Sequence, residues 1–106
     1  MRIRAAISLA AALLAATTGF ARGEGDKALG EYLSSECVTC HQITGQHQGI
    51  PPIVGWPKSM FIDIMNEYRM KKRSNPIMQT IAGRLSAEEV ASLAAYFGSL
   101  PYPPAK

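Results

Sequence analysis

Apolar residues recur at helical spacing in three segments of the chain, and no segment is identified as a β-strand. The pattern predicts a first helix over residues 26–37, a second over residues 59–70 and a third that starts after Ser86. The inward faces are expected to carry Leu29, Tyr32 and Leu33; Phe61, Ile64, Met65 and Tyr68; and Val90, Leu93, Ala94 and Phe97. The predicted fold class is therefore all-α.

Local signals suggest where two of these helices begin and end. Ser59 is the expected N-cap of the second helix. Ser86 and Glu89 form a capping-box signature at the start of the third, in which Ser86 caps the Glu89 amide and Glu89 reaches back. Gly98 is expected just past the end of that helix, with Pro101 beyond it.

Two segments are expected to be irregular. Residues 42–57 contain three Gly and three Pro, which excludes a regular element there. Asn75-Pro76 breaks the chain after the second helix, and we expect an irregular stretch from Pro76 to Ser86. In the first helix, Gly30 costs about 1 kcal/mol relative to Ala, so a packing reason is expected for it.

The N-terminus has the layout of a secretory signal peptide. Arg2 and Arg4 precede an apolar run over residues 5–16, and small residues at 19–21 fit a cleavage site. The alternative is an uncleaved membrane anchor, but the run is shorter than the roughly 20 residues that a spanning helix needs. We therefore expect residues 1–21 to be cleaved, with a periplasmic protein that has no stable membrane insertion.

The predicted mature domain, residues 22–106, is small and nearly neutral. Without the two leader arginines the formal net charge falls from +3 to about +1, which does not favour a nucleic-acid-binding protein. A domain of this size buries only a small hydrophobic core, which gives it little stability. Its two cysteines allow at most one disulfide within the chain. A large apolar cofactor within the core would solve this stability problem.

The segment Cys37-Val38-Thr39-Cys40-His41 is the main chemical signal. C-x-x-C-H is typical of covalent haem attachment, in which two thiols bind the porphyrin edge and the next imidazole binds the iron. A thioredoxin-like dithiol would need a surrounding βαβ pattern, and a structural disulfide would leave the histidine unexplained. A zinc site would need four ligands, of which His47 would have to be one.

A haem iron bound by His41 alone would be open on its other face. Electron carriers usually close that face with Met or His. The candidates are Met60, Met65, Met70, Met78 and His47. Met78 is favoured because it lies in a connecting stretch held by a helix at each end. Met65 belongs to an apolar stripe, where Met is more often a packing residue.

The chain from residue 22 onward resembles the class I cytochromes c. The features that carry the resemblance are Gly30, the C-x-x-C-H segment, Gly49-Ile50-Pro51-Pro52-Ile53-Val54-Gly55, Met78, Leu85-Ser86-Ala87-Glu88-Glu89-Val90 and Ala94-Ala95-Tyr96-Phe97. The resemblance implies a class I cytochrome c fold, with three to four helices wrapped around one covalently bound haem and long loops.

The resemblance also implies roles for single residues. Cys37 and Cys40 would carry the thioethers, and His41 and Met78 would be the axial ligands of the iron. The Pro51 carbonyl would accept the proton of the other ring nitrogen of the ligating histidine. Two further residues would form the haem environment: Ile53 would pack on the haem, and Trp56 would approach a propionate. Gly30 would let the first and last helices cross closely near Tyr96 or Phe97.

Within this class, the segments GIPPIVGWP and NPIMQTIAGRLSAEEVASLAAYF are similar to small bacterial cytochromes of sulfur oxidation, such as the haem subunit of flavocytochrome c sulfide dehydrogenase. The expected function is electron transfer, as a soluble carrier or as the cytochrome subunit of a sulfur-compound dehydrogenase, with a flavoprotein or other dehydrogenase subunit as partner. The alternative is a five-coordinate haem protein that acts as a gas sensor or peroxidase. A basic cluster over residues 69–73 would help to steer an acidic partner, or would simply stabilise a helix end.

Overall fold

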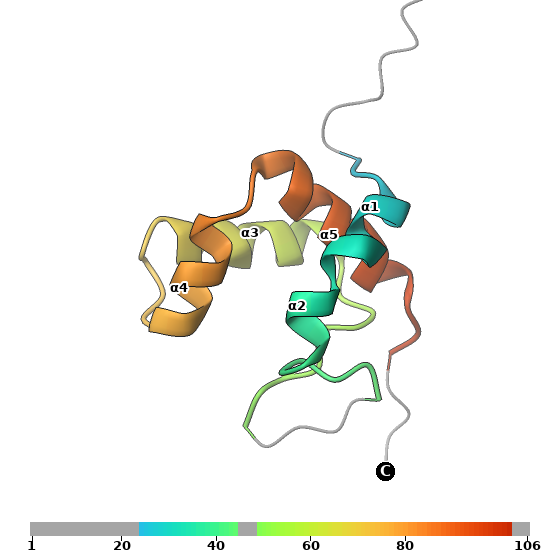
Figure 1. Ribbon diagram of the computed structural model, residues 1–106, viewed down its shortest axis with the longest axis horizontal. Helices are drawn as coiled ribbons and strands as arrows, with labels where there is room; N and C mark the ends of the chain where they lie inside the picture. Colours follow the sequence, from blue (N-terminus) through green and yellow to red (C-terminus); the bar gives the residue numbers. More distant parts are fainter. Residues whose placement is uncertain (1–23, 45–48, 103–106) are drawn as a thin grey trace, which may run out of the picture.

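The computed structural model describes residues 24–44 and 49–102, and these ranges contain five helices and no β-strand (Figure 1). The helices are α1 (Lys27–Leu33), α2 (Ser35–Val38), α3 (Lys58–Arg69), α4 (Pro76–Gly83) and α5 (Ala87–Ser99). The all-α prediction is confirmed, but the expected number of three to four helices is too low. The predicted signal peptide lies outside the described residues.

Helix α1 crosses α5 at Gly30. A Cβ on Gly30 would overlap the main-chain carbonyl oxygen of Ser92 and would lie 2.8 Å from the Cβ of Tyr96. The main-chain N–H of Asp26 also donates a hydrogen bond of 2.9 Å to the hydroxyl of Ser92, which is fully buried. The expectation that Gly30 permits a close approach to the last helix near Tyr96 is therefore confirmed.

The first predicted helix is interrupted at Ser34. Its hydroxyl donates to the carbonyl of Glu31 at 2.6 Å, and the chain restarts as the short helix α2. The prediction of a continuous helix over residues 26–37 is therefore wrong. The Ser34 side chain competes with backbone N–H groups for the carbonyl of Glu31. The prediction that Tyr32 faces inward is also wrong, since this residue is 79% exposed. It lies two residues from Gly30, about 200° around the helix from the face that meets α5.

Two other expected helix ends differ from the structure. Helix α3 has Pro57 as its N-cap, so Ser59 lies inside the helix and does not cap it. Helix α5 continues through Gly98 to Ser99. A Cβ on Gly98 would lie 3.0 Å from the carbonyl oxygen of Trp56, so this glycine serves a close approach between α5 and the segment before α3.

Residues 76–83 form a helix where an irregular stretch was predicted. The Asn75 side chain accepts hydrogen bonds of 3.1 Å from the N–H groups of both Ile77 and Met78. Pro76 occupies the first turn, where its missing N–H costs nothing. Asn75-Pro76 therefore separates α3 from α4 and also starts α4. The sequence analysis predicted only the separation.

Helix α5 starts as predicted. The Ser86 hydroxyl accepts from the N–H of Glu89 at 3.1 Å, and the Glu89 carboxylate accepts from the N–H of Ser86 at 2.9 Å. The capping box fixes the first turn and hence the rotation of the helix. Its predicted inward residues are all buried: Val90, Leu93, Ala94 and Phe97.

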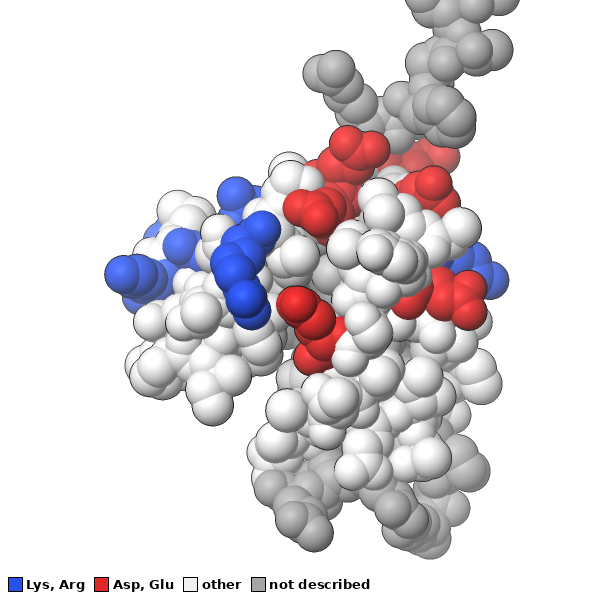
Figure 2. Space-filling model, in the orientation of Figure 1, with Lys and Arg blue, Asp and Glu red and all other residues white. Residues whose placement is uncertain are grey.

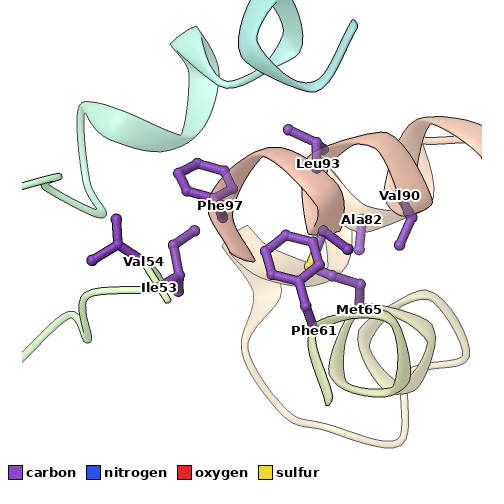
Figure 3. Close-up of a cluster of buried hydrophobic side chains, with 9 residues drawn as sticks. Ile53, Val54, Phe61, Met65, Ala82, Val90, Leu93 and Phe97 are labelled. Carbon is purple, nitrogen blue, oxygen red and sulfur yellow. The ribbon is translucent and has the colours of Figure 1, made fainter. Parts of the chain in front are cut away.

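The core lies between α3 and α5 and is extended by the segment before α3 (Figure 3). Its buried members are Ile53, Val54, Phe61, Met65, Ala82, Val90, Leu93, Ala94 and Phe97. The rings of Phe61 and Phe97 stack with centroids 5.9 Å apart. The N–H of Gly55 donates to the carbonyl of Phe97 at 2.8 Å, which ties residues 49–57 to α5 although they form no regular element.

Candidate functional site

A cavity of about 240 Å³ opens beside this core, bordered by α2, residues 49–56, α3 and α4. Figure 1 shows α2 and α4 standing apart, below α3 and α5 in this view. All seven site residues expected from the sequence line this cavity: Cys37, Cys40, His41, Pro51, Ile53, Trp56 and Met78. Residues that are up to 41 positions apart in the chain therefore share one site.

The two cysteines lie in and just after α2. The N–H of His41 donates to the Cys37 carbonyl at 2.7 Å, which continues a helical turn and brings the histidine to the same wall as Cys37. The thiols are not joined by a disulfide; Cys37 is half-buried and Cys40 is exposed. Burial, together with the charge of Glu36, raises the pKa of the Cys37 thiol to about 11. A redox dithiol needs a lowered pKa, so the arrangement disfavours a thioredoxin-like site.

The imidazole of His41 is oriented by the main chain. Its Nδ1 lies 2.6 Å from the carbonyl oxygen of Pro51. A carbonyl can only accept, so the proton of a neutral imidazole belongs on Nδ1. This leaves the lone pair of Nε2 available to a metal, in the arrangement typical of ligating histidines whose other nitrogen is held by a carbonyl.

The structure reduces the list of methionine candidates. Met65 and Met78 line the cavity. Met60 and Met70 are not among the lining residues and are 39% and 64% exposed. His47 lies outside the described residues. Met65 is 6% exposed and belongs to the core on α3, whereas Met78 is half-buried in the first turn of α4.

The cavity walls suit a large apolar ring. Most of the remaining lining is apolar or aromatic and comes from α3 and α4, including Phe61, Ile64, Tyr68, Ile77 and Ile81. Within residues 24–44 and 49–102, no group of three or more His, Cys, Asp or Glu side chains is placed to hold a metal ion directly. Two thiols, an imidazole with a free Nε2 and a thioether around an apolar cavity fit a haem better than a bare metal ion.

Part of this lining was not predicted as such. Ile64 and Tyr68 were assigned to a core-facing stripe, and the structure shows that the stripe also forms a cavity wall. Ile77 and Ile81 were missed because α4 was expected to be irregular. The spacing of these two residues, four apart on one helix face, was the signal that could have identified them.

A family model described as Cytochrome c matches residues 27–101, which is more than half of the chain and includes every residue assigned to the site. The chain belongs to the cytochrome c family. The class-level resemblance seen in the sequence is confirmed. The family model implies covalently bound haem c and electron transfer for residues 27–101.

Three curated relatives are similar to this cytochrome. A thiosulfate dehydrogenase electron acceptor from Stutzerimonas stutzeri is 36% identical over 70 residues, covering 63% of this chain and 32% of that protein. A protein of the same name from Thiomonas intermedia is 30% identical over the same shares. Cytochrome c4 from Pseudomonas aeruginosa is 30% identical over 84 residues, covering 77% of this chain and 42% of that protein. The chain thus spans less than half the length of the curated relatives that it matches.

None of the helices in residues 24–44 and 49–102 is long and apolar enough to cross a bilayer.

Proposed function

We propose that this cytochrome carries electrons in the periplasm through one haem c whose iron is bound by His41 and Met78. The observation that carries the proposal is a single cavity with Cys37, Cys40 and His41 on the α2 side and Met78 on the α4 side. Residues 1–21 would be the leader that exports the chain, and residues 22–106 the cytochrome domain.

The structure supports Met78 over Met65 through its placement. Met65 is packed among core side chains on α3, where its sulfur fills space. Met78 lies in the first turn of a helix that is held at its start by Asn75, and it lines the cavity from the α4 side. Met78 would then come from the short helix α4, and His41 from the turn that follows the short helix α2.

The chain's residues define what the site can do. The haem supplies one-electron chemistry at iron, and His/Met ligation favours a high reduction potential. Cys37 and Cys40 would hold the haem covalently, and the Pro51 carbonyl holds the imidazole of His41 in one orientation. Apolar side chains such as Phe61 and Ile64 exclude water, and Trp56 would lie toward a propionate. If His41 and Met78 both bound the iron, the protein would leave no position on it for a substrate.

The names of the relatives support a partner of a particular chemistry. Two of them are electron acceptors of thiosulfate dehydrogenase. We therefore infer that the present cytochrome accepts electrons from a dehydrogenase of an inorganic sulfur compound, as a soluble carrier or as its cytochrome subunit, and that the donor is a flavoprotein or another dehydrogenase subunit.

Replacing each cavity methionine by leucine tests the ligand assignment. Met78→Leu should abolish the weak long-wavelength absorption band of a methionine-sulfur bond to ferric iron, because leucine keeps the volume but has no sulfur. Met65→Leu is the matched control and should retain the band. Loss of the band in Met65→Leu, or its persistence in Met78→Leu, contradicts the assignment. A high-spin spectrum in the unmodified protein would favour the open-iron alternative of a gas sensor or peroxidase.

A further inference from the structure

The two sides of the haem cavity belong to helices that pack on different neighbours. Helix α2, which carries Cys37, packs on α1, whereas α4, which carries Met78, packs on α3. Both helices border the cavity. Each helix is thus anchored separately, so a direct link between the two would act on the opening of the cavity.

One ion pair forms such a link. The guanidinium of Arg84, the C-cap residue of α4, lies 3.9 Å from the carboxylate of Glu36 in α2 (Nη2 to Oε2). Figure 2 shows a blue group on the α4 side and a red group on the α2 side that approach each other in this view. Within residues 24–44 and 49–102, Arg84 and Glu36, here called the bridging pair, form the only ion pair that connects the two sides of the cavity.

The backbone fixes both ends of the bridging pair. The N–H of Arg84 donates to the carbonyl of Ile81 at 3.2 Å, and the neighbouring Ala82 is fully buried. At the other end, Glu36 directly precedes Cys37 in α2 and lines the cavity. The charges therefore sit on the helix of the proposed distal ligand and beside the haem attachment point.

We propose that Arg84 and Glu36 are positioning residues whose attraction holds the helix that carries Met78 closed against the haem-attachment helix. The proposal rests on Met78 as the distal ligand and adds what keeps that ligand in place. The attraction is lost when the two sides separate, so it favours the closed state. The two side chains are 63% and 64% exposed, so solvent limits this preference to a few fold and salt weakens it. The bridging pair thus sets how often the distal face of the iron opens.

The rate at which cyanide binds the ferric protein measures this opening, because cyanide can bind only after Met78 has left the iron. Glu36→Gln and Arg84→Gln should each speed cyanide binding about threefold at low salt. The two variants change the net charge in opposite directions, so net charge cannot explain the same acceleration in both. The double variant should also be about threefold faster rather than about ninefold, because the second substitution removes no further attraction.

Glu31→Gln is the matched control for these variants. It removes the same charge as Glu36→Gln, but from α1, where Glu31 is exposed and forms no ion pair with another described residue. Its rate should stay within about 1.5-fold of that of the unmodified protein. At about 1 M salt the unmodified protein should bind cyanide as fast as Glu36→Gln, since charges are then screened within about 3 Å.

Exchanging the two charges separates attraction from a local structural role. Glu36→Arg with Arg84→Glu restores opposite charges at the same two places, so its low-salt rate should return to within about 1.5-fold of the unmodified rate. If Arg84 only stabilised the end of α4, the exchange would be the worst variant, because glutamate would face the negative end of the helix dipole. A second readout does not depend on the iron: hydrogen exchange at the Ala82 amide should quicken about threefold in Glu36→Gln and stay unchanged in Glu31→Gln.

The outcomes that overturn the proposal are specific. Rates for Glu36→Gln and Arg84→Gln that match Glu31→Gln remove the bridging pair from this role, and so does a charge-exchanged variant that stays fast. A failure of the ligand assignment looks different. The unmodified protein would then lack the long-wavelength methionine band, and both the ligand assignment and the positioning role would fall. A protein that keeps the band while both variants match the control loses the positioning role alone.

Discussion

Gly30 sets the distance between α1 and α5. A side chain at this position would overlap the Ser92 carbonyl, so Gly30→Ala forces the two helices apart. We expect it to lower the free energy of unfolding by about 2 kcal/mol, in the range of overpacked core sites. Gly83→Ala is the control, because a Cβ there meets nothing within 4 Å. It should be neutral or stabilising by up to about 1 kcal/mol. Denaturant unfolding of the two haem-loaded variants measures the difference, and similar values for both would contradict this account.

The same crossing shows how far single residues can be predicted. A mid-helix glycine is conspicuous because it is costly, so the sequence pointed to Gly30. The last helix as its neighbour was implied only by the resemblance to class I cytochromes c. Ser92 gave no such signal. It is a polar residue within an apolar helix, and its burial makes sense only once the N–H of Asp26 is seen to bind its hydroxyl. Asp26 and Ser92 are 66 positions apart, so their contact depends on the assembled fold. The local sequence pattern around either residue carries no information about it.

Helix α4 controls the proposed distal ligand. Asn75 caps the turn that carries Met78, and removing an N-cap side chain typically costs about 1 kcal/mol. Asn75→Ala should therefore make Met78 easier to displace. Cyanide has to displace Met78 to bind the ferric iron. If the whole loss of about 1 kcal/mol falls on the turn that carries Met78, cyanide should bind about fivefold more tightly. An optical cyanide titration measures this shift.

Ser86→Ala provides the matched control for that experiment, because it removes the N-cap of α5 instead. Its loss of stability should be similar, about 1 kcal/mol, but cyanide affinity should stay within about twofold of the unmodified protein. Equal tightening in both variants would show that cyanide binding follows global stability and would contradict a specific role for α4.

The elements differ in how well the sequence predicted them. Helices α3 and α5 have long apolar stripes, and Phe61, Met65, Leu93 and Phe97 are buried as expected. The shorter elements were missed or merged, because four to eight residues give too little periodicity to outweigh a break signal. The C-x-x-C-H residues could still be predicted without α4, since their spacing is identified from chemistry rather than from secondary structure. Met78 was favoured for its place between two helices, although that stretch is itself a helix.

At the scale of the whole molecule, the described chain is arranged around a cavity rather than around a closed core. Helices α4 and α5 both pack directly on α3, and α1 packs on α5, but α2 and α4 border the cavity and do not close it. A cofactor that binds only the folded state adds its binding free energy to the stability of that state. The attached haem is therefore expected to supply a large part of the stability of this small domain.

Removing both attachment cysteines tests that expectation. The double variant Cys37→Ala with Cys40→Ala cannot anchor the haem, and the chain would have to leave an apolar cavity of about 240 Å³ beside a small core. We expect a largely unfolded protein with a weak helical signal in far-ultraviolet circular dichroism. Met78→Leu is the control: it keeps both thioethers and should stay folded, although its iron loses the proposed ligand. Native-like helicity in the cysteine variant would show that α3 and α5 alone organise the fold, and that the haem is bound by a preformed domain.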